Sequence, residues 1–187
     1  MSCVADIVAG MPITTRRAVP DDGAALHVLA ARTFGLACPP GTPQSDVDAF
    51  IALHLSEAKF GEYLKDPNRI ILIGFADEVP VGYAMLVRGP IADPDVRALV
   101  DQDSSVELSK FYVLADSHGS GIAAELMAAT LAAAAEIGAG SCWLGVNQRN
   151  ARAGKFYAKH GFEVVGTKRF LVGDQWHDDF VRVRSLV

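Results

Sequence analysis

The stretch Ser105 to Ala139 reads SVELSKFYVLADSHGSGIAAELMAATLAAAAEIGA and contains three patterns in succession. Residues 106–114 are rich in β-branched and aromatic side chains, which favours a strand. The polar segment 115–121 carries glycines at positions 119 and 121 and predicts a turn. From Ile122 onward apolar side chains recur at helical spacing, so the sequence predicts strand, turn and helix in that order.

This order of elements is typical of an anion-binding site. The first N–H groups of a helix have no partner within it, and the helix dipole adds partial positive charge there. Gly119 and Gly121 carry no Cβ, so a phosphate can approach the backbone closely. Residues 119–124, GSGIAA, also match the dinucleotide motif G-x-G-x-x-G/A. That assignment is disfavoured because no carboxylate ends the next predicted strand, Cys142 to Val146.

Two motifs resemble those of the GNAT superfamily of acyl-CoA-dependent N-acetyltransferases. Residues 118–123, HGSGIA, are similar to the family's Arg/Gln-x-x-Gly-x-Gly/Ala motif from Gly121 onward, with His118 in place of the usual Arg or Gln. Residues 150–162, NARAGKFYAKHGF, resemble its second motif, N-x-x-A-x-x-F-Y-x-K-x-G-F. The resemblance covers about residues 13–186, and the layout looks most like bacterial polyamine or small-amine acetyltransferases.

The resemblance implies an α/β fold with a GNAT-like mixed, mostly antiparallel sheet of about seven strands and helices on both faces. Only the strand at 142–147 is expected to be parallel to its predecessor, which it reaches through a crossover helix. Residues 1–12 are predicted to be an N-terminal tail, and residues 13–187 a single N-acetyltransferase domain. Residues 35–45 are predicted to be a loop, and segment 35–65 as a whole should wall the acceptor pocket.

Composition narrows the partners and the compartment. The net charge is −5, which disfavours a nucleic-acid partner and favours a cationic substrate, the alternative being the ordinary charge of a well-dissolved protein. No apolar run reaches the ~18 residues that would span a membrane. Three cysteines without C-x-x-C spacing indicate reduced thiols of a cytoplasmic protein: Cys3, Cys38 and Cys142. We expect no metal, because strand alternation separates His177, Asp178 and Asp179. The oligomeric state stays open, with a homodimer as one alternative.

The resemblance also implies acetyl-CoA as the co-substrate. Backbone N–H groups of residues 119–124 would bind its diphosphate, and the strand around 111–113 would pair with its pantetheine arm and polarise the thioester carbonyl. Asn150 either binds the pantetheine or caps its own helix. The predicted coenzyme-binding residues are Phe111, Tyr112, Val113, His118, Gly119, Ser120, Gly121, Ile122, Ala123, Ala124, Asn150 and Tyr157.

Two residues are candidates for catalysis. The resemblance implies that Tyr157 protonates the departing CoA thiolate, the alternative being a purely structural core aromatic. Glu107 is the candidate general base, acting through water on the acceptor amine; simple alternation places it on the same side of the strand as Phe111. The alternative role for Glu107 is an ion pair with a basic residue such as Arg88. At Gly145 some family members carry a second acid, which this chain lacks.

The sequence therefore predicts an N-acetyltransferase. It would transfer an acetyl group from acetyl-CoA to a primary amine of a small molecule or peptide, directly within a ternary complex. The alternative from another class is a non-catalytic acyl-CoA-binding sensor or regulatory module of the same fold.

Overall fold

The computed structural model describes residues 12–38, 41–172 and 175–187. The predicted tail, 1–12, therefore lies outside the described residues apart from Pro12, and so does Cys3. The strands are β1 (Ile13–Arg17), β2 (Arg69–Ala76), β3 (Val79–Val87), β4 (Ser105–Val113), β5 (Ser141–Asn147), β6 (Glu163–Val172) and β7 (Gln175–Ser185). The α-helices are α1 (Gly23–Ala37), α2 (Gln44–His54), α3 (Glu57–Tyr63), α4 (Pro94–Arg97), α5 (Ile122–Glu136) and α6 (Ala151–Lys159).

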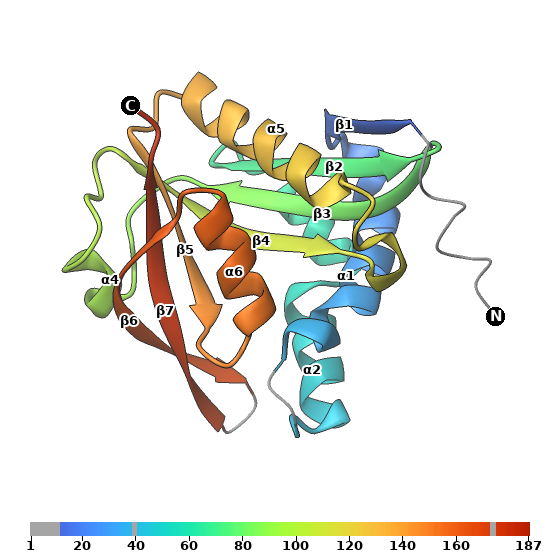
Figure 1. Ribbon diagram of the computed structural model, residues 1–187. Coiled ribbons are helices and arrows are strands. Elements are labelled where there is room, and N and C mark those ends of the chain that lie inside the picture. The colour runs from blue at the N-terminus through green and yellow to red at the C-terminus, as the bar shows by residue number, and fades with distance from the viewer. Residues whose placement is uncertain (1–11, 39–40, 173–174) are drawn as a thin grey trace.

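All seven strands belong to one sheet, in the order β1-β2-β3-β4-β5-β7-β6. Neighbouring strands are antiparallel except for β4 and β5, which are parallel as predicted. Helix α5 makes the crossover between these two strands and lies along the sheet in Figure 1. A parallel pair requires such a connection because the chain must return to the same end of the sheet.

Helices cover both faces of the sheet, which confirms the predicted fold class. On one face Leu26 of α1 and Phe60 of α3 pack with Tyr83 of β3. On the other face Leu126 of α5 packs in a cluster with Leu86 of β3, and α6 completes that layer. Because successive side chains of a strand point to opposite faces, β3 contributes apolar residues to both cores.

The sheet opens between its two central strands. Residues 105–107 of β4 pair with residues 141–143 of β5, and the pairing stops there. Figure 1 shows the arrowheads of β4 and β5 pointing away from each other. Among the described residues no strand pairs with β4 on its β5 side beyond Glu107, so this edge of β4 borders an opening in the sheet.

A β-bulge interrupts β4 just after this point. Leu86 of β3 lies opposite Leu108, and Met85 lies opposite Lys110, so Ser109 has no partner on β3. An extra residue on one strand reverses the facing of every side chain that follows it.

The bulge makes the predicted facing of Glu107 wrong. Glu107 lies opposite Val87 and Tyr112 lies opposite Tyr83, both on the α1 side of the sheet. Phe111 instead packs in the cluster beneath α5 and α6. Glu107 therefore shares its face with Lys110 and Tyr112 rather than with Phe111, because the unpaired residue lies between them.

The predicted loop at 35–45 is shorter than expected. Helix α1 continues to Ala37, and α2 begins at Gln44. The rings of Phe34 in α1 and Phe50 in α2 stack with centroids 4.4 Å apart, so tertiary packing supports the added helical turn.

Candidate active site

Two connected cavities of about 250 Å³ each occupy the opening between β4 and β5. We call them the turn chamber, which borders the loop before α5, and the aromatic chamber, which extends toward α2 and the β6–β7 hairpin. Together they form the cleft. Both chambers are lined by Ala37, Phe111, Tyr112, Asn150, Ala153 and Tyr157.

The turn chamber ends at the start of α5, where the backbone needs glycine. Gly119 and Gly121 have φ angles of +88° and +94°, in the left-handed region that residues with a Cβ rarely adopt. Gly121 is the N-cap residue and offers no side chain to the helix. Ala124 donates its N–H to the Gly121 carbonyl at 3.0 Å, so the unpaired donors of this turn precede Ala124.

The structure places the predicted turn residues in two groups. Val113, His118 and Ala123 line the turn chamber. Ile122 has a side chain only 1% exposed, which packs in the core, so only its backbone can serve a ligand. The other predicted turn residues do not line the chamber, so only their backbone groups can serve a ligand: Gly119, Ser120, Gly121 and Ala124.

His118 contacts a cation from the second motif. Arg152 of α6 donates from Nη2 to Nε2 of His118 at 2.6 Å, and the carbonyl of Val113 lies 3.1 Å from the same nitrogen. Burial, together with the Arg152 charge, lowers the pKa of His118, which favours the neutral ring that accepts from Arg152. The turn itself has His118 where the family motif usually has Arg or Gln, and the guanidinium group at this end of the chamber comes from Arg152 of α6. Sequence reasoning missed Arg152, although it lies inside the quoted second motif.

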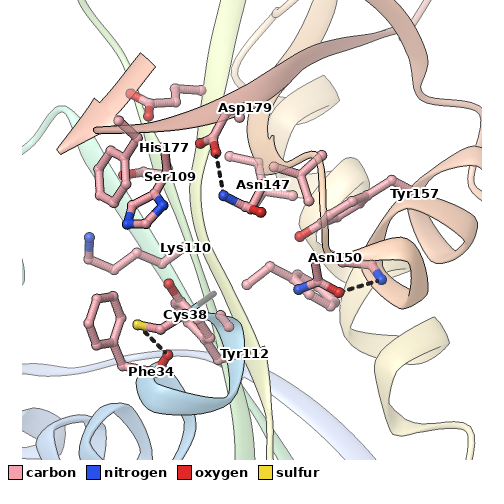
Figure 2. Close-up of a pocket in the computed structure, with 18 of the residues that line it drawn as sticks. Phe34, Cys38, Ser109, Lys110, Tyr112, Asn147, Asn150, Tyr157, His177 and Asp179 are labelled. Carbon is pink, nitrogen blue, oxygen red and sulfur yellow. Dashed lines mark hydrogen bonds between the residues drawn. The ribbon is translucent and has the colours of Figure 1, made fainter. Parts of the chain in front are cut away.

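Tyr157 lies where the two chambers meet. Its side chain is 9% exposed, and Figure 2 shows its hydroxyl directed into the cavity. Ring contacts with Phe111 at 6.3 Å and Phe162 at 5.8 Å hold its orientation. Burial raises the pKa of the phenol well above its usual range, so the hydroxyl keeps its proton at neutral pH.

Asn150 has the capping role that was one of its two predicted alternatives. Its side-chain oxygen accepts the N–H of Ala153 at 3.0 Å, which satisfies a free donor at the start of α6. Asn150 also lines both chambers, so the cap does not remove it from the cleft.

Aromatic rings line the far end of the aromatic chamber. Phe34 and Phe50 are stacked with an interplanar angle of 5°, and Phe170 of β6 lies edge-on to Phe50 at 6.1 Å. These rings come from three elements: α1, α2 and β6. They give the chamber a flat apolar wall.

Glu107 lies at the closed end of the cleft and lines the aromatic chamber. Burial raises the pKa of its carboxyl, and the charges of Lys168, Lys110 and Arg69 partly oppose that shift. The alternative ion pair with Arg88 is not formed: among the described residues, no basic group lies within 4.0 Å of the Glu107 carboxylate.

Three charged residues of the aromatic chamber were not predicted: Lys110, Lys168 and Asp179. Burial lowers the pKa of Lys110 to about 8 and raises the pKa of Asp179. Asp179 is 7% exposed and accepts a long hydrogen bond of 3.5 Å from Asn147. A charged residue within an apolar strand could have indicated such a site from the sequence, as at Lys110 between Leu108 and Phe111.

The missing side chain at Gly145 has a structural consequence. A Cβ at this position would lie 2.7 Å from Cε of Lys168 and 3.4 Å from a carboxylate oxygen of Asp179. Glycine thus leaves room for Lys168 to cross β5. In this chain, the space beside position 145 contains the Lys168 side chain from β6, whereas some family members carry a second acid at this position.

His177 and Asp179 both line the aromatic chamber, whereas Asp178 between them is exposed. Within residues 12–38, 41–172 and 175–187, no three His, Cys, Asp or Glu side chains are grouped as a metal site. In the same residues no helix is long and apolar enough to cross a membrane.

A glycine turn at a helix start, beside a sheet that opens between its two parallel strands, is the arrangement that the GNAT resemblance implies. Residues 36–162 match the model of the acetyltransferase (GNAT) family. Over 166 residues the chain is 48% identical to uncharacterized N-acetyltransferases of Mycobacterium tuberculosis and Mycobacterium bovis, covering 89% of this chain and 99% of each relative. The chain belongs to the GNAT family and is an enzyme that acts as an N-acetyltransferase.

Solved structures share the fold at low sequence identity. The PaiA N-acetyltransferase of Thermoplasma acidophilum, in complex with coenzyme A, is 21% identical with a TM-score of 0.75, covering 94% of this chain and 99% of that chain. YncA of Salmonella typhimurium, solved with acetyl-CoA, is 19% identical with a TM-score of 0.62, covering 94% and 95%.

Proposed function

We propose that the enzyme transfers the acetyl group of acetyl-CoA directly to a primary amine of a small molecule or peptide within a ternary complex. The observation that carries this proposal is the pair of chambers meeting at Tyr157. Two substrates that occupy neighbouring chambers can react where the chambers meet, without a covalent enzyme intermediate. The coenzyme complexes of the PaiA and YncA relatives support acetyl-CoA as the donor.

Acetyl-CoA is assigned to the turn chamber. Its diphosphate accepts hydrogen bonds from the backbone around Gly119 and Gly121, where the helix dipole favours negative charge. Arg152 adds a cation at this end, and its contact with His118 can be exchanged for a phosphate oxygen. The pantetheine lies along the unpaired edge of β4 like an added strand.

The reaction then requires three proton transfers. After deprotonation the amine nitrogen bonds to the thioester carbon, and a main-chain N–H near residues 111–113 stabilises the oxyanion. As the C–S bond breaks, Tyr157 donates a proton to the thiolate, and the nitrogen loses its second excess proton, which returns through water to the Tyr157 oxygen. Glu107, through water, takes the proton that the attacking ammonium must lose, because an alkylammonium with a pKa near 10.4 is not a nucleophile.

The proposal is tested by thiol release from acetyl-CoA with a panel of amines, and the products are identified by mass spectrometry. Initial rates at varied concentrations of both substrates should give intersecting lines, as a ternary complex requires. Parallel lines together with an acetylated protein would contradict direct transfer. Coenzyme binding without thiol release for any amine would favour the sensor alternative.

A further inference from the structure

Lys110 ends in a part of the cleft remote from the proposed site of acetyl transfer. Its strand position after the bulge directs it into the aromatic chamber. In Figure 2 the end of its side chain lies on the same side of the cavity as the His177 and Phe34 rings, and Tyr157 lies on the opposite side. The Nζ atom is 5.9 Å from the centroid of the Tyr63 ring. Lys110 therefore faces whatever part of an acceptor extends away from the reacting amine.

The cations around Lys110 already have carboxylate partners. Arg69 and Lys59 also lie over the Tyr63 ring, at 4.5 and 5.6 Å. Arg69 pairs with Asp66 at 3.0 Å. Lys59 pairs with Glu62 at 2.6 Å.

Lys110 itself has no such partner. Among the described residues no carboxylate lies within 4.0 Å of its Nζ, and the nearest acidic influence is the more distant Glu107. Arg69 from β2 and His54 from α2 also act on it electrostatically, and His177 of β7 lines the same chamber. A half-buried ammonium without a counter-ion is unfavourable, and a bound anion would remove that penalty. The lowered pKa of Lys110, about 8, agrees with this environment and still leaves it mostly charged at pH 7.

The aromatic chamber is lined by two acidic and two basic side chains that do not pair with one another. Glu107 and Asp179 oppose Lys110 and Lys168, and among the described residues none of the four forms an ion pair within 4.0 Å. A ligand with one positive and one negative end matches such a chamber, whereas a polycation would bring its second charge toward a lysine.

We propose that the amine acceptor also carries an oxyanion, a carboxylate or a phosphate, which Lys110 binds at the aromatic end of the cleft. The inference rests on the proposed acetylation of an amine and names the class of that amine. The reactive amine lies toward Tyr157 and the oxyanion lies toward Lys110. The wall formed by Phe34, Phe50 and Phe170 lines the same end of the chamber as Lys110 and contacts the apolar part of the acceptor next to its oxyanion.

The test compares acceptors that differ only in the anionic group. Amino acids with the carboxylate near to or far from the amine are each paired with their own carboxamide; aminoalkyl phosphates and diamines of similar length are added. Wild type should use the anionic members at least about tenfold better in kcat/KM, mainly through KM, since a charge-assisted contact is of that size. Comparison of the carboxylate and phosphate arms identifies the oxyanion.

Two variants locate the effect. Lys110→Met should abolish the preference, lowering kcat/KM for the anionic members about 10- to 100-fold and for the amides less than about threefold. Lys59→Met is the matched control: Lys59 lies over the same ring but has its own acid and does not line the cleft, so the preference should persist.

Affinity measured by calorimetry in the presence of saturating coenzyme A separates this inference from the proposed reaction. If no amine is acetylated, the proposed function fails, yet tighter binding of carboxylates than of amides that Lys110→Met removes would still support the anion site. Equal affinity for both members of each pair would overturn the inference. A Lys110→Met loss that is uniform over all acceptors, or an acetyl group found on Lys110 itself, would also overturn it.

Discussion

Tyr157 is the residue at which the proposed chemistry of the two chambers converges. Its ring belongs to a buried aromatic cluster, and its hydroxyl faces the cleft with a raised pKa. A phenol that stays protonated at neutral pH can donate to a thiolate only as the C–S bond breaks.

Replacing Tyr157 by Phe tests the donor role. Tyr157→Phe keeps the ring contacts, so we expect unchanged affinity for coenzyme A and a kcat lowered about 10- to 100-fold. Calorimetry and steady-state kinetics provide the two readouts. A kcat equal to that of wild type would assign Tyr157 a packing role alone.

Glu107 is the second residue whose role can be tested through pH. If it relays the amine proton, Glu107→Gln should lower kcat/KM about 10²-fold at pH 7. The loss should shrink toward alkaline pH, where free amine is abundant without a base. Wild-type kcat/KM should rise with slope one below the pKa of the base, which burial raises. A defect of constant size from neutral to alkaline pH would leave Glu107 with a structural role.

At the scale of elements, the β4–α5 turn combines a backbone constraint with the proposed diphosphate site. Gly121→Glu adds both bulk and negative charge next to the free N–H groups. We expect affinity for coenzyme A to fall more than tenfold by calorimetry, because a carboxylate repels the diphosphate.

The control for this variant is Gly121→Ala, which has the same left-handed backbone strain without the charge. The added Cβ also limits how closely the diphosphate can approach, so the affinity of this variant should fall, but less than that of Gly121→Glu, and its stability will fall as well. Equal losses of affinity in both variants would mean that strain, and not charge, accounts for the result.

The pairing of β3 with β4 depends on glycine at position 82. A Cβ there would lie 2.8 Å from the carbonyl oxygen of Tyr112 and 3.3 Å from Cα of Val113, which are backbone atoms that cannot move independently. Gly82→Ala should therefore lower the free energy of unfolding by about 1–3 kcal/mol in urea denaturation. Gly61→Ala, in a helix with nothing within 4 Å, is the control and should be neutral or stabilising.

For the molecule as a whole, burial of Lys110 in the cleft makes the free energy of unfolding depend on pH. The pKa of Lys110 is about 8 in the folded protein against 10.5 as the reference value, so between these pH values the unfolded chain binds more protons. Lys110 therefore makes the free energy of unfolding increase as pH rises from about 8 to 10.5. Below about pH 8 the charged ammonium destabilises the folded state to its full extent.

Lys110→Met removes this penalty. At pH 7 the variant should exceed wild type in free energy of unfolding by about 1–3 kcal/mol, and the difference should narrow toward pH 10. Urea denaturation at both pH values measures it. A difference that does not change with pH would show that the charge of Lys110 is not the cause.

The family resemblance, the order of the elements and the single parallel strand pair could be predicted from the sequence. These features depend on local patterns: alternation for strands, helical spacing for residues 122–137, and glycines at the turn. In the structure Tyr157 and the turn lie near one another, because both follow consecutive parallel strands that end at the same edge of the sheet.

The side chains that meet in the cleft could be identified only from the folded structure. One unpaired residue, Ser109, turned Lys110 toward the cavity and Phe111 away from it, and residue types alone do not reveal a bulge. The contact of Arg152 with His118 and the approach of Lys168 across Gly145 join residues that are far apart in the chain. Such contacts depend on strand register and helix placement, which the packing of the whole core fixes.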